Sequence, residues 1–555
     1  MNENLVALIA IIAPLFFIIT AVVSWFQTGM RPKLLKKLSV TATVVNIIIA
    51  TICSFFVIQN GLLETAFMGY DDLGFSLRLD ALSMLMLGMI ALLGFIVVRY
   101  SLNYLDGDHR QGIFIGRLAA TIASVQFLVL SGNLGLLFVS WVLTSMSLHR
   151  LLIFYRERPG AIIAARKKFI LARLGDLCLF LAVILLFNQF GTGNLEIIFQ
   201  QIQNSITAGI SLDGIEFVAL LLAGAALLKS AQFPTHGWLI EVMETPTPVS
   251  ALLHAGLLNA GPFLIIRMAF VMEASVYAPL VLIVLGGFTA LFASVVFLTQ
   301  TSIKTALGYS SVAHMGFSLL VCGLGVYPAA MLHLVAHSFY KAHSFLSSGS
   351  VIDVIRANKI TAAKRMGNPS RILLGILLAL GTYTAFAFVW GIDPVNELSL
   401  LVIGAIITLG LSKIFTTALD STASIQLILR ASFMAILVTI AFFSLESAMH
   451  FLLDSQVPEL VRPNFTEMVL VGVLLFAFAA VVFLQILAPV LTTSPFYSAI
   501  AVHLRNGFYI NTVFDRMVRA LYAHGTQTKP QVIESVDYIN NQEVISIEDY
   551  QEQPA

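Results

Sequence analysis

Long apolar runs recur along the chain from the N-terminus to about residue 491, and short polar segments separate them. A helix needs roughly 20 mainly apolar residues to span a bilayer, and only helices can satisfy their own backbone groups there within one segment. The pattern therefore predicts an all-α polytopic membrane protein with about fifteen transmembrane helices. The predicted spans are 5–26, 40–58, 81–99, 114–132, 134–155, 169–189, 215–243, 247–271, 277–298, 303–324, 328–352, 371–391, 398–418, 426–447 and 466–491.

The charges of the connecting segments alternate in sign along this series. The even-numbered connections are acidic or neutral, and the odd-numbered ones are basic, as in the segments after the first, fifth and eleventh spans: Arg31, Lys33, Lys36, Lys37; Arg156, Arg158, Arg166, Lys167, Lys168; Arg356, Lys359, Lys364, Arg365, Arg371. Because Lys and Arg accumulate in cytoplasmic loops, we expect the N-terminus outside and the C-terminus in the cytoplasm of a cell inner membrane. The first run lacks a preceding basic segment and a small-residue cleavage site, so we expect a retained helix.

The character of the chain changes after residue 495, which predicts two parts. Residues 1–495 form the transmembrane domain, and 496–555 form a cytoplasmic C-terminal segment. The stretch 496–529 is mixed and partly amphipathic, and the tail beyond Lys529 has six acidic residues and no basic one. A short acidic tail of this kind is typical of a solvated, disordered segment.

Composition supports the membrane prediction and excludes several classes of function. Apolar residues make up 58% of the chain and charged residues 11%, with a net charge of +1. The three cysteines lie far apart inside apolar runs, which predicts core packing rather than a disulfide or metal pattern. The sequence contains no phosphate-binding G-x-x-x-x-G-K-[ST], no G-x-G-x-x-G and no C-x-x-C, so a nucleotide-driven pump and a self-contained redox enzyme are disfavoured.

Lys229 is the clearest charged residue within a span. It follows nine small or apolar residues, and Pro234 lies five positions further on. A charge at the bilayer centre costs from roughly 3 to more than 10 kcal/mol. A lysine at this depth is therefore expected to have a specific function or a route to the interface. A proline leaves the carbonyl of Ser230 without its helical donor and bends the helix. A lysine beside an opened turn is suited to relaying a proton, the alternative being a lysine that extends to the interface.

A second group of titratable residues lies in the span 328–352. His333, His337 and Lys341 are spaced by four, which places them on one face of a helix. Histidine titrates near neutrality, which suits proton transfer. Metal binding by the two histidines is the alternative, although no Cys or carboxylate lies near them in sequence to complete a site.

Three further residues extend this series. Asp176 lies three positions after Arg173, so a structural ion pair and a relay role are both open. His254 lies at the start of a span, where capping or packing is the alternative. Lys413 lies towards the cytoplasmic end of the span 398–418, where it could instead reach the interface.

Several stretches resemble the proton-translocating antiporter-like membrane subunits, which include chain 5 of NADH-quinone oxidoreductase and the large Mrp antiporter subunits. The stretches are Leu228 to Pro234, Thr245 to His254, Gln300 to Ser310, and His333 to Ile352. The resemblance implies a fold of two inverted five-helix repeats that contain broken helices. It implies proton carriage by Lys229, His254, His333, His337 and Lys341, with Asp176 as the acidic residue of the family's Arg-x-Gly-Asp segment and Lys413 as the terminal lysine.

Two departures narrow the resemblance. Val142 follows Trp141 where the respiratory subunit has a glutamate that partners the first lysine. We therefore expect Asp176 to be the counter-ion of Lys229, the alternative being a different coupling scheme. The long lateral helix of the respiratory subunit is missing after residue 515. The stretches Ser147 to Pro159 and Tyr340 to Gly349 look most like the membrane subunits of the DAB inorganic-carbon accumulation complexes.

That branch implies an ion-translocating transporter subunit that is not itself an enzyme. A cation gradient, with H+ as the expected ion, would drive CO2 hydration or bicarbonate accumulation by a cytoplasmic, β-carbonic-anhydrase-like partner (DabA). The zinc would belong to that partner, and this chain would carry no cofactor. The alternatives are a pump subunit of a respiratory complex, an Mrp-type Na+/H+ antiporter subunit, and a passive membrane anchor whose charges are structural.

Overall fold

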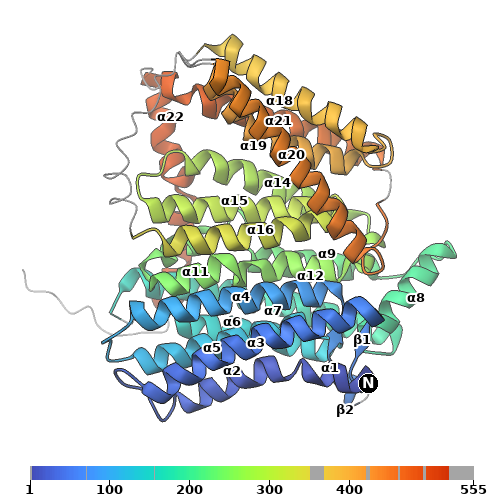
Figure 1. Cartoon of the computed structure of the whole chain (residues 1–555), viewed down its shortest axis with the longest axis vertical. Coiled ribbons are helices and arrows are strands. Elements are labelled where there is room, and N and C mark those ends of the chain that lie inside the picture. Colours follow the sequence, from blue (N-terminus) through green and yellow to red (C-terminus); the bar gives the residue numbers. More distant parts are fainter. Residues whose placement is uncertain are drawn as a thin grey trace, which may run out of the picture.

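The computed structural model describes residues 3–70, 72–155, 157–349, 368–419, 425–460, 463–491 and 495–523. Long helices lie side by side, with the N-terminal helices at one end of the longest axis and α18 to α21 at the other (Figure 1). They are α2 (Ile12–Val23), α3 (Lys33–Asn60), α4 (Ala81–Tyr104), α5 (Gln111–Val129), α6 (Leu134–Leu152), α7 (Pro159–Phe190), α9 (Ile215–Lys229), α14 (Tyr277–Phe297), α15 (Ile303–Gly323), α16 (Tyr327–Leu346), α18 (Pro369–Trp390), α19 (Leu398–Leu419), α20 (Ile425–Leu453) and α21 (Phe465–Leu491).

The shorter elements join or cap these helices. Four short strands form two antiparallel pairs, β1 with β4 and β2 with β3, between α3 and α4. The short elements are β1 (Leu63–Glu64), β2 (Met68–Tyr70), β3 (Leu73–Phe75), β4 (Arg78–Leu79), α1 (Glu3–Ile9), α8 (Leu195–Thr207), α10 (Gly237–Glu241), η1 (Val242–Glu244), α11 (Thr247–Ala255), η2 (Leu257–Asn259), α12 (Ala260–Arg267), α13 (Ala269–Glu273), α22 (Pro495–Arg505), η3 (Gly507–Tyr509) and α23 (Ile510–Ala523).

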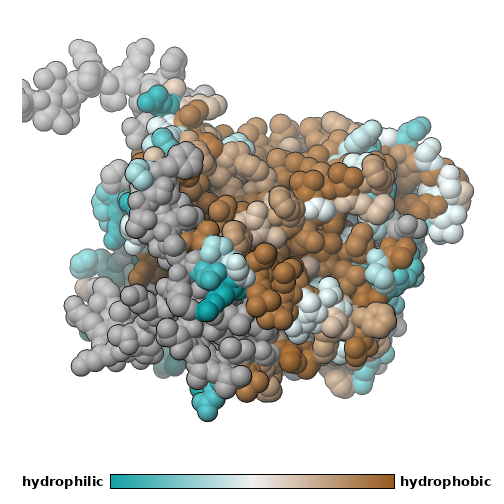
Figure 2. Space-filling model, turned by 90° about the horizontal axis from the view of Figure 1, so that it is seen from above, coloured by the Kyte–Doolittle hydropathy of each residue, from teal (hydrophilic) through white to brown (hydrophobic). Residues whose placement is uncertain are grey.

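The predicted all-α membrane architecture is confirmed, but the count of about fifteen spans is not. Twelve helical segments in the described part of the chain are long and apolar enough to cross a membrane. The three predicted spans outside this set, 215–243, 328–352 and 398–418, fall on the broken pair α9–α10, on α16 and on α19. A broad apolar surface lies between more hydrophilic margins when the molecule is viewed along its long axis (Figure 2).

Connections that were predicted to lie on one side of the membrane contact one another. At the end with the basic connections, Lys36 binds Asp106 at 2.7 Å and Arg110 binds Glu157 at 2.9 Å. At the opposite end, Arg78 binds Glu196 at 2.7 Å. The structure therefore has two polar ends that agree with the alternation of charge in the sequence, while the assignment of one end to the cytoplasm stays a prediction.

The start of α7 differs from the prediction. The predicted span began at residue 169, but the helix begins at Pro159, where proline is favoured because the first helical position needs no N–H donor. Lys167 and Lys168 therefore lie inside the helix and are buried, rather than in a basic loop. Lys167 donates hydrogen bonds to Glu241 at 2.6 Å and to Asn511 at 2.9 Å.

The C-terminal helices pack on the end that carries the basic connections. Asn511 of α23 donates to Glu241 at 2.6 Å, and Asp515 forms an ion pair with the buried Lys167. Arg505 donates to the carbonyl of Thr299 at 3.2 Å. The predicted acidic tail lies outside the described residues, so the domain boundary at 495 stays a prediction.

A buried ion cluster fastens α4 to α12 near the opposite end. Asp80 caps α4 through Ser83 N–H at 2.8 Å, and its carboxylate binds Arg267 at 2.5 Å and Arg78 at 2.7 Å. All three charged residues are less than 5% exposed. We expect Asp80→Asn to lower the free energy of unfolding by about 3 kcal/mol, because two guanidinium groups would stay buried without their carboxylate.

Thermal unfolding of the purified protein in detergent would measure this effect. Asp106→Asn is the matched control, because Asp106 pairs with Lys36 at a more exposed position and exposed pairs contribute little. Equal melting temperatures for the two variants would show that the buried cluster does not hold α4 to α12.

Candidate functional site

The helix carrying Lys229 is broken at the predicted place. Helix α9 ends at Lys229, and helical structure resumes at Gly237 in α10, with Pro234 between them. The carbonyl of Ser230, which has lost its helical donor, accepts a hydrogen bond from the side-chain amide of Gln232 at 2.8 Å. A second interruption, at Gly256, separates α11 from η2 and α12. The sequence around Pro234 thus predicted both the break and the carbonyl that it frees.

The ammonium group of Lys229 rests against α6. It donates hydrogen bonds to the Ser145 hydroxyl at 2.7 Å and to the Trp141 carbonyl at 3.2 Å. Its nitrogen also lies 4.0 Å from the centroid of the Trp141 ring, a cation–π contact. A second buried ammonium group, that of Lys168, donates to the carbonyl of Ser145 at 2.8 Å. Two lysines from different helices therefore meet at one residue.

Asp176 is the acidic residue of this first cluster, which comprises Ser145, Lys168, Arg173, Asp176 and Lys229. Its carboxylate binds Arg173 at 2.6 Å, one turn earlier on α7. Lys229, Arg173 and Lys168 are its charged neighbours. In the described part of the chain no ion pair within 4.0 Å joins Asp176 to Lys229, so the role of Asp176 as counter-ion stays a prediction.

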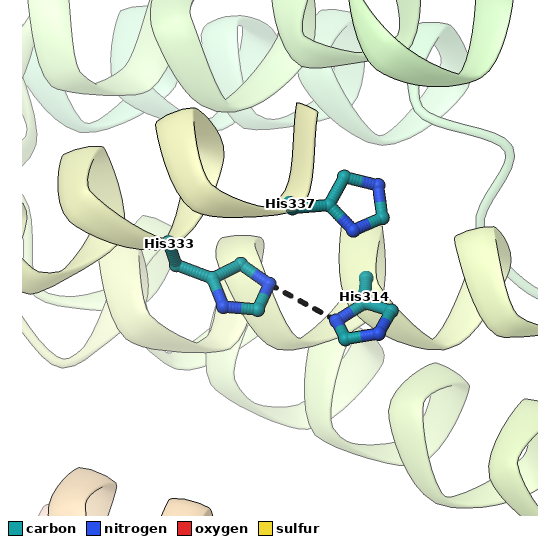
Figure 3. A group of neighbouring side chains, drawn as sticks. All are labelled: His314, His333 and His337. Carbon is teal, nitrogen blue, oxygen red and sulfur yellow. Dashed lines mark hydrogen bonds between the residues drawn. The ribbon is translucent and has the colours of Figure 1, made fainter. Parts of the chain in front are cut away.

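The second cluster centres on three histidines from two helices (Figure 3). His314 of α15 lies opposite His333 and His337 of α16, and its Nδ1 is 3.3 Å from Nε2 of His333. The ring centroids of His314 and His337 are 4.6 Å apart, whereas those of His333 and His337 are 5.9 Å apart. His314 therefore bridges the two histidines that the sequence placed on one stripe.

Lys341 and His254 complete the second cluster at its other end. Both side chains are fully buried. The ammonium group of Lys341 donates to the carbonyl of Leu307 at 3.2 Å, and the ring of His254 stacks on Phe345 with centroids 4.3 Å apart. Neither ring nitrogen of His254 has a hydrogen-bond partner among the described residues, which leaves both free for water or a proton donor.

The predicted site residues thus form two groups rather than one continuous chain. Lys229 and Asp176 belong to the first, and His254, His333, His337 and Lys341 belong to the second. The groups are joined through packing, since Ser230, next to Lys229, donates to the carbonyl of Leu258 at 3.2 Å in the segment after α11. The side chain of Lys413 lies outside the part of the chain that the structure describes.

Sequence reasoning missed His314 and Lys168. His314 is a single histidine in the middle of a predicted span, and a lone histidine is more often a packing residue than a relay. Lys168 was assigned to a basic loop because the start of α7 was placed too late. For His314 the only available signal was its position within an otherwise apolar run.

The three histidines could hold a transition-metal ion. Their donor nitrogens lie within 4.8 Å of one another, and tetrahedral zinc is bound by three histidines in several known sites. The structure therefore provides three histidine ligands, whereas the sequence pattern predicted two. Metal binding at these histidines needs a direct test.

Comparisons with known proteins show that the chain is similar to antiporter-like membrane subunits. The family model described as "NADH:quinone oxidoreductase/Mrp antiporter, TM" matches residues 131–392, and that of the "NADH-Ubiquinone oxidoreductase (complex I), chain 5 N-terminus" matches residues 67–115. The chain is similar to the "probable inorganic carbon transporter subunit DabB2" of Halothiobacillus neapolitanus, with 35% identity over 450 residues and 81% of each chain covered.

Two other relatives illustrate the breadth of the similarity. NADH-quinone oxidoreductase subunit L of Escherichia coli is 36% identical over 288 residues, which cover 51% of this chain and 46% of that protein. A chain in the structure of the Mrp complex from a Dietzia species matches with a TM-score of 0.59 and 21% identity, covering 96% of this chain and 61% of that one. At this identity the structural match shows a shared fold.

Proposed function

Because the chain belongs to the family of the DabB inorganic carbon transporter subunits, within the antiporter-like membrane proteins, we propose that it conducts H+ down its gradient to drive inorganic-carbon accumulation. Its relatives are transporter and antiporter-like membrane subunits, so its role is ion translocation rather than enzyme catalysis. The driven reaction would be CO2 hydration or bicarbonate accumulation in the cytoplasm.

The observation that carries this proposal is the pair of buried titratable clusters. Ionisable residues within membrane spans are rare and mark ion paths. Here lysines and histidines from α7, α9, α11, α15 and α16 converge within the packed helices, and the donor nitrogens of the three histidines are within 4.8 Å of one another. In a passive membrane anchor these buried titratable groups would have no function to offset the free-energy cost of burying them.

The partner in this proposal is a cytoplasmic β-carbonic-anhydrase-like subunit of the DabA type. The relatives named as inorganic carbon transporter subunits imply a complex with other subunits. We propose an inner-membrane location with the basic end of the bundle in the cytoplasm, where such a partner would bind. The C-terminal helices α22 and α23 pack on that same end.

The test is growth and uptake in a bacterium that lacks carbonic anhydrase. Co-expression of this chain with its partner should permit growth in air, and an uncoupler should abolish bicarbonate uptake. Growth that survives full collapse of the ion gradient would overturn the coupling. Sodium-for-proton exchange in vesicles without the partner would assign an Mrp-type antiporter instead, and purification with quinone reductase subunits would assign a respiratory pump.

We also propose that the zinc of the complex belongs to the partner and that the histidines of α15 and α16 act as proton carriers. Metal analysis of the purified complex should then find zinc in proportion to the partner subunit. Zinc in proportion to this chain, and lost in a His314→Phe variant, would instead assign the three histidines as a metal site.

Asp176 provides a smaller test of the first cluster. We expect Asp176→Asn to reduce gradient-driven uptake by about fivefold, because Lys168, Arg173 and Lys229 would lose the charge of a neighbouring carboxylate. The interaction lost is ~1 kcal/mol, which corresponds to that factor in rate. Bicarbonate uptake into cells at a fixed protein level would measure this effect. Asp176→Glu should restore most of the activity, and uptake that is unchanged in Asp176→Asn would reduce Asp176 to a structural partner of Arg173.

A further inference from the structure

Two adjoining cavities open at the end of the bundle opposite to the basic connections. The first, of about 400 Å³, lies beside the starts of α16 and α19 and the end of α20. The second, of about 320 Å³, extends it towards α13 and the start of α21. They share Gly325, Pro458, Glu459 and Leu460 as lining residues, so we treat them together as the acidic vestibule.

The vestibule is lined by carboxylates from several segments that are far apart in sequence. No lysine or arginine is among its described lining residues, and its one histidine, His450, is 4.0 Å from Asp454. The carboxylates are those of Glu273, Glu397, Glu446, Asp454, Glu459 and Glu467. A concave surface of one charge sign concentrates ions of the opposite sign, so the vestibule favours cations.

Not all of these carboxylates are free to bind an ion. Glu397 accepts a hydrogen bond from the backbone of Asp393 at 2.8 Å, and Glu467 caps the start of α21 through Asn464 N–H at 2.9 Å. Glu273 and Glu459 face each other as like charges, and burial followed by the charge of Glu459 raises the pKa of Glu273. A bound cation would relieve that repulsion.

Glu446 is the feature that distinguishes the vestibule from an ordinary acidic surface. It lies on α20, lines the first cavity and is only 5% exposed. Within the described part of the chain its carboxylate forms no hydrogen bond and no ion pair, and its charged neighbours are His450 and Glu397. Its oxygens are not among the fully buried unpaired atoms of the described residues, so they face the cavity, where an entering cation would bind them.

The position of the vestibule connects it to the histidines. Val326 and Pro328 line the first cavity at the start of α16, the helix that carries His333. His333 follows Pro328 by five positions, a rise of ~8 Å along the helix axis. Helix α16 packs against α20 and also against α15, which carries His314.

We propose that the acidic vestibule is a cation-binding site on the outer side of the membrane and that it delivers the translocated cation to His333. The binding site stands on the cavity and on Glu446, whereas the direction of delivery rests on the proposed function. Glu446 is the inner ligand of the site, and the carboxylates nearer the rim raise the local concentration of cations.

Terbium(III) is a suitable probe, because it binds carboxylate oxygens and reports binding by luminescence. We expect saturable Tb³⁺ binding to the purified complex, and Glu446→Gln should weaken it by about tenfold because one charged ligand is lost. Tb³⁺ added to the outer side of sealed vesicles should block proton flux in the wild type, and the variant should need a correspondingly higher concentration.

Asp213→Asn is the matched control, since Asp213 is an exposed carboxylate at the same end that does not line either cavity. Equal Tb³⁺ affinity in the wild type and in Glu446→Gln would overturn the site. Binding that depends on Glu446 but leaves proton flux unaffected would overturn delivery to His333. Binding that depends on Glu446 in a complex without any flux would support the site while it refutes the proposed function.

Discussion

Replacement of Lys229 by methionine should reduce gradient-driven inorganic-carbon uptake by about a hundredfold while the complex still assembles. A charge within the membrane without a titratable group to carry it faces a barrier of about 3 kcal/mol, and each ~1.4 kcal/mol is a factor of ten in rate. Methionine keeps the length of the side chain, and among the described residues Lys229 would lose two hydrogen bonds, those to Ser145 and Trp141. Uptake of labelled bicarbonate, normalised to the amount of purified complex, would measure the effect.

Lys37→Met is the control for this variant. Lys37 is an exposed lysine on α3, at the end with the basic connections, and it lies outside both clusters. We expect its uptake to equal that of the wild type. Full activity of Lys229→Met would show that the first cluster is structural. If Lys229→Met does not assemble, comparison with Lys229→Arg, which keeps the charge, would show whether the defect lies in folding.

The break at Lys229 was predictable because its causes are local. Pro234 removes a backbone donor and crowds the preceding turn whatever surrounds it, and the apolar run before Lys229 fixes the depth of the lysine. The stripe of His333, His337 and Lys341 was predictable for the same reason, since a spacing of four residues defines one helix face. Properties that depend on a single helix can therefore be read from the sequence.

The partners of these residues were not predictable, because they come from other helices. The absence of a glutamate at Val142 drew attention to Asp176, but the structure shows neutral oxygens of Ser145 and Trp141 on the ammonium group of Lys229. Ser145 lies one turn after Val142 on α6. It is uncharged, so nothing in the sequence pattern marks it as a partner of Lys229. Which side chain contacts a buried lysine depends on how α6, α7 and α9 pack. That packing cannot be read directly from the sequence.

His314→Phe tests the contact that only the structure supplies. Proton transfer needs donor and acceptor within hydrogen-bond reach, about 3 Å, and His314 is 3.3 Å from His333. Without it, the remaining histidines have ring centroids 5.9 Å apart. We expect gradient-driven uptake to fall by about thirtyfold, because the intervening step would have to use water at a cost of ~2 kcal/mol. Phenylalanine keeps the aromatic volume, so the packing of α15 against α16 should survive.

His343→Phe is the matched control on α16. His343 is exposed and lies beyond Lys341, away from His314. The same substitution there should leave uptake unchanged, and both variants should melt at the wild-type temperature. Uptake that falls equally in the two variants would reflect a general effect of losing a histidine from α15 or α16. Uptake that falls only in His314→Phe would place the proton path across the contact between α15 and α16, at the pair His314 and His333.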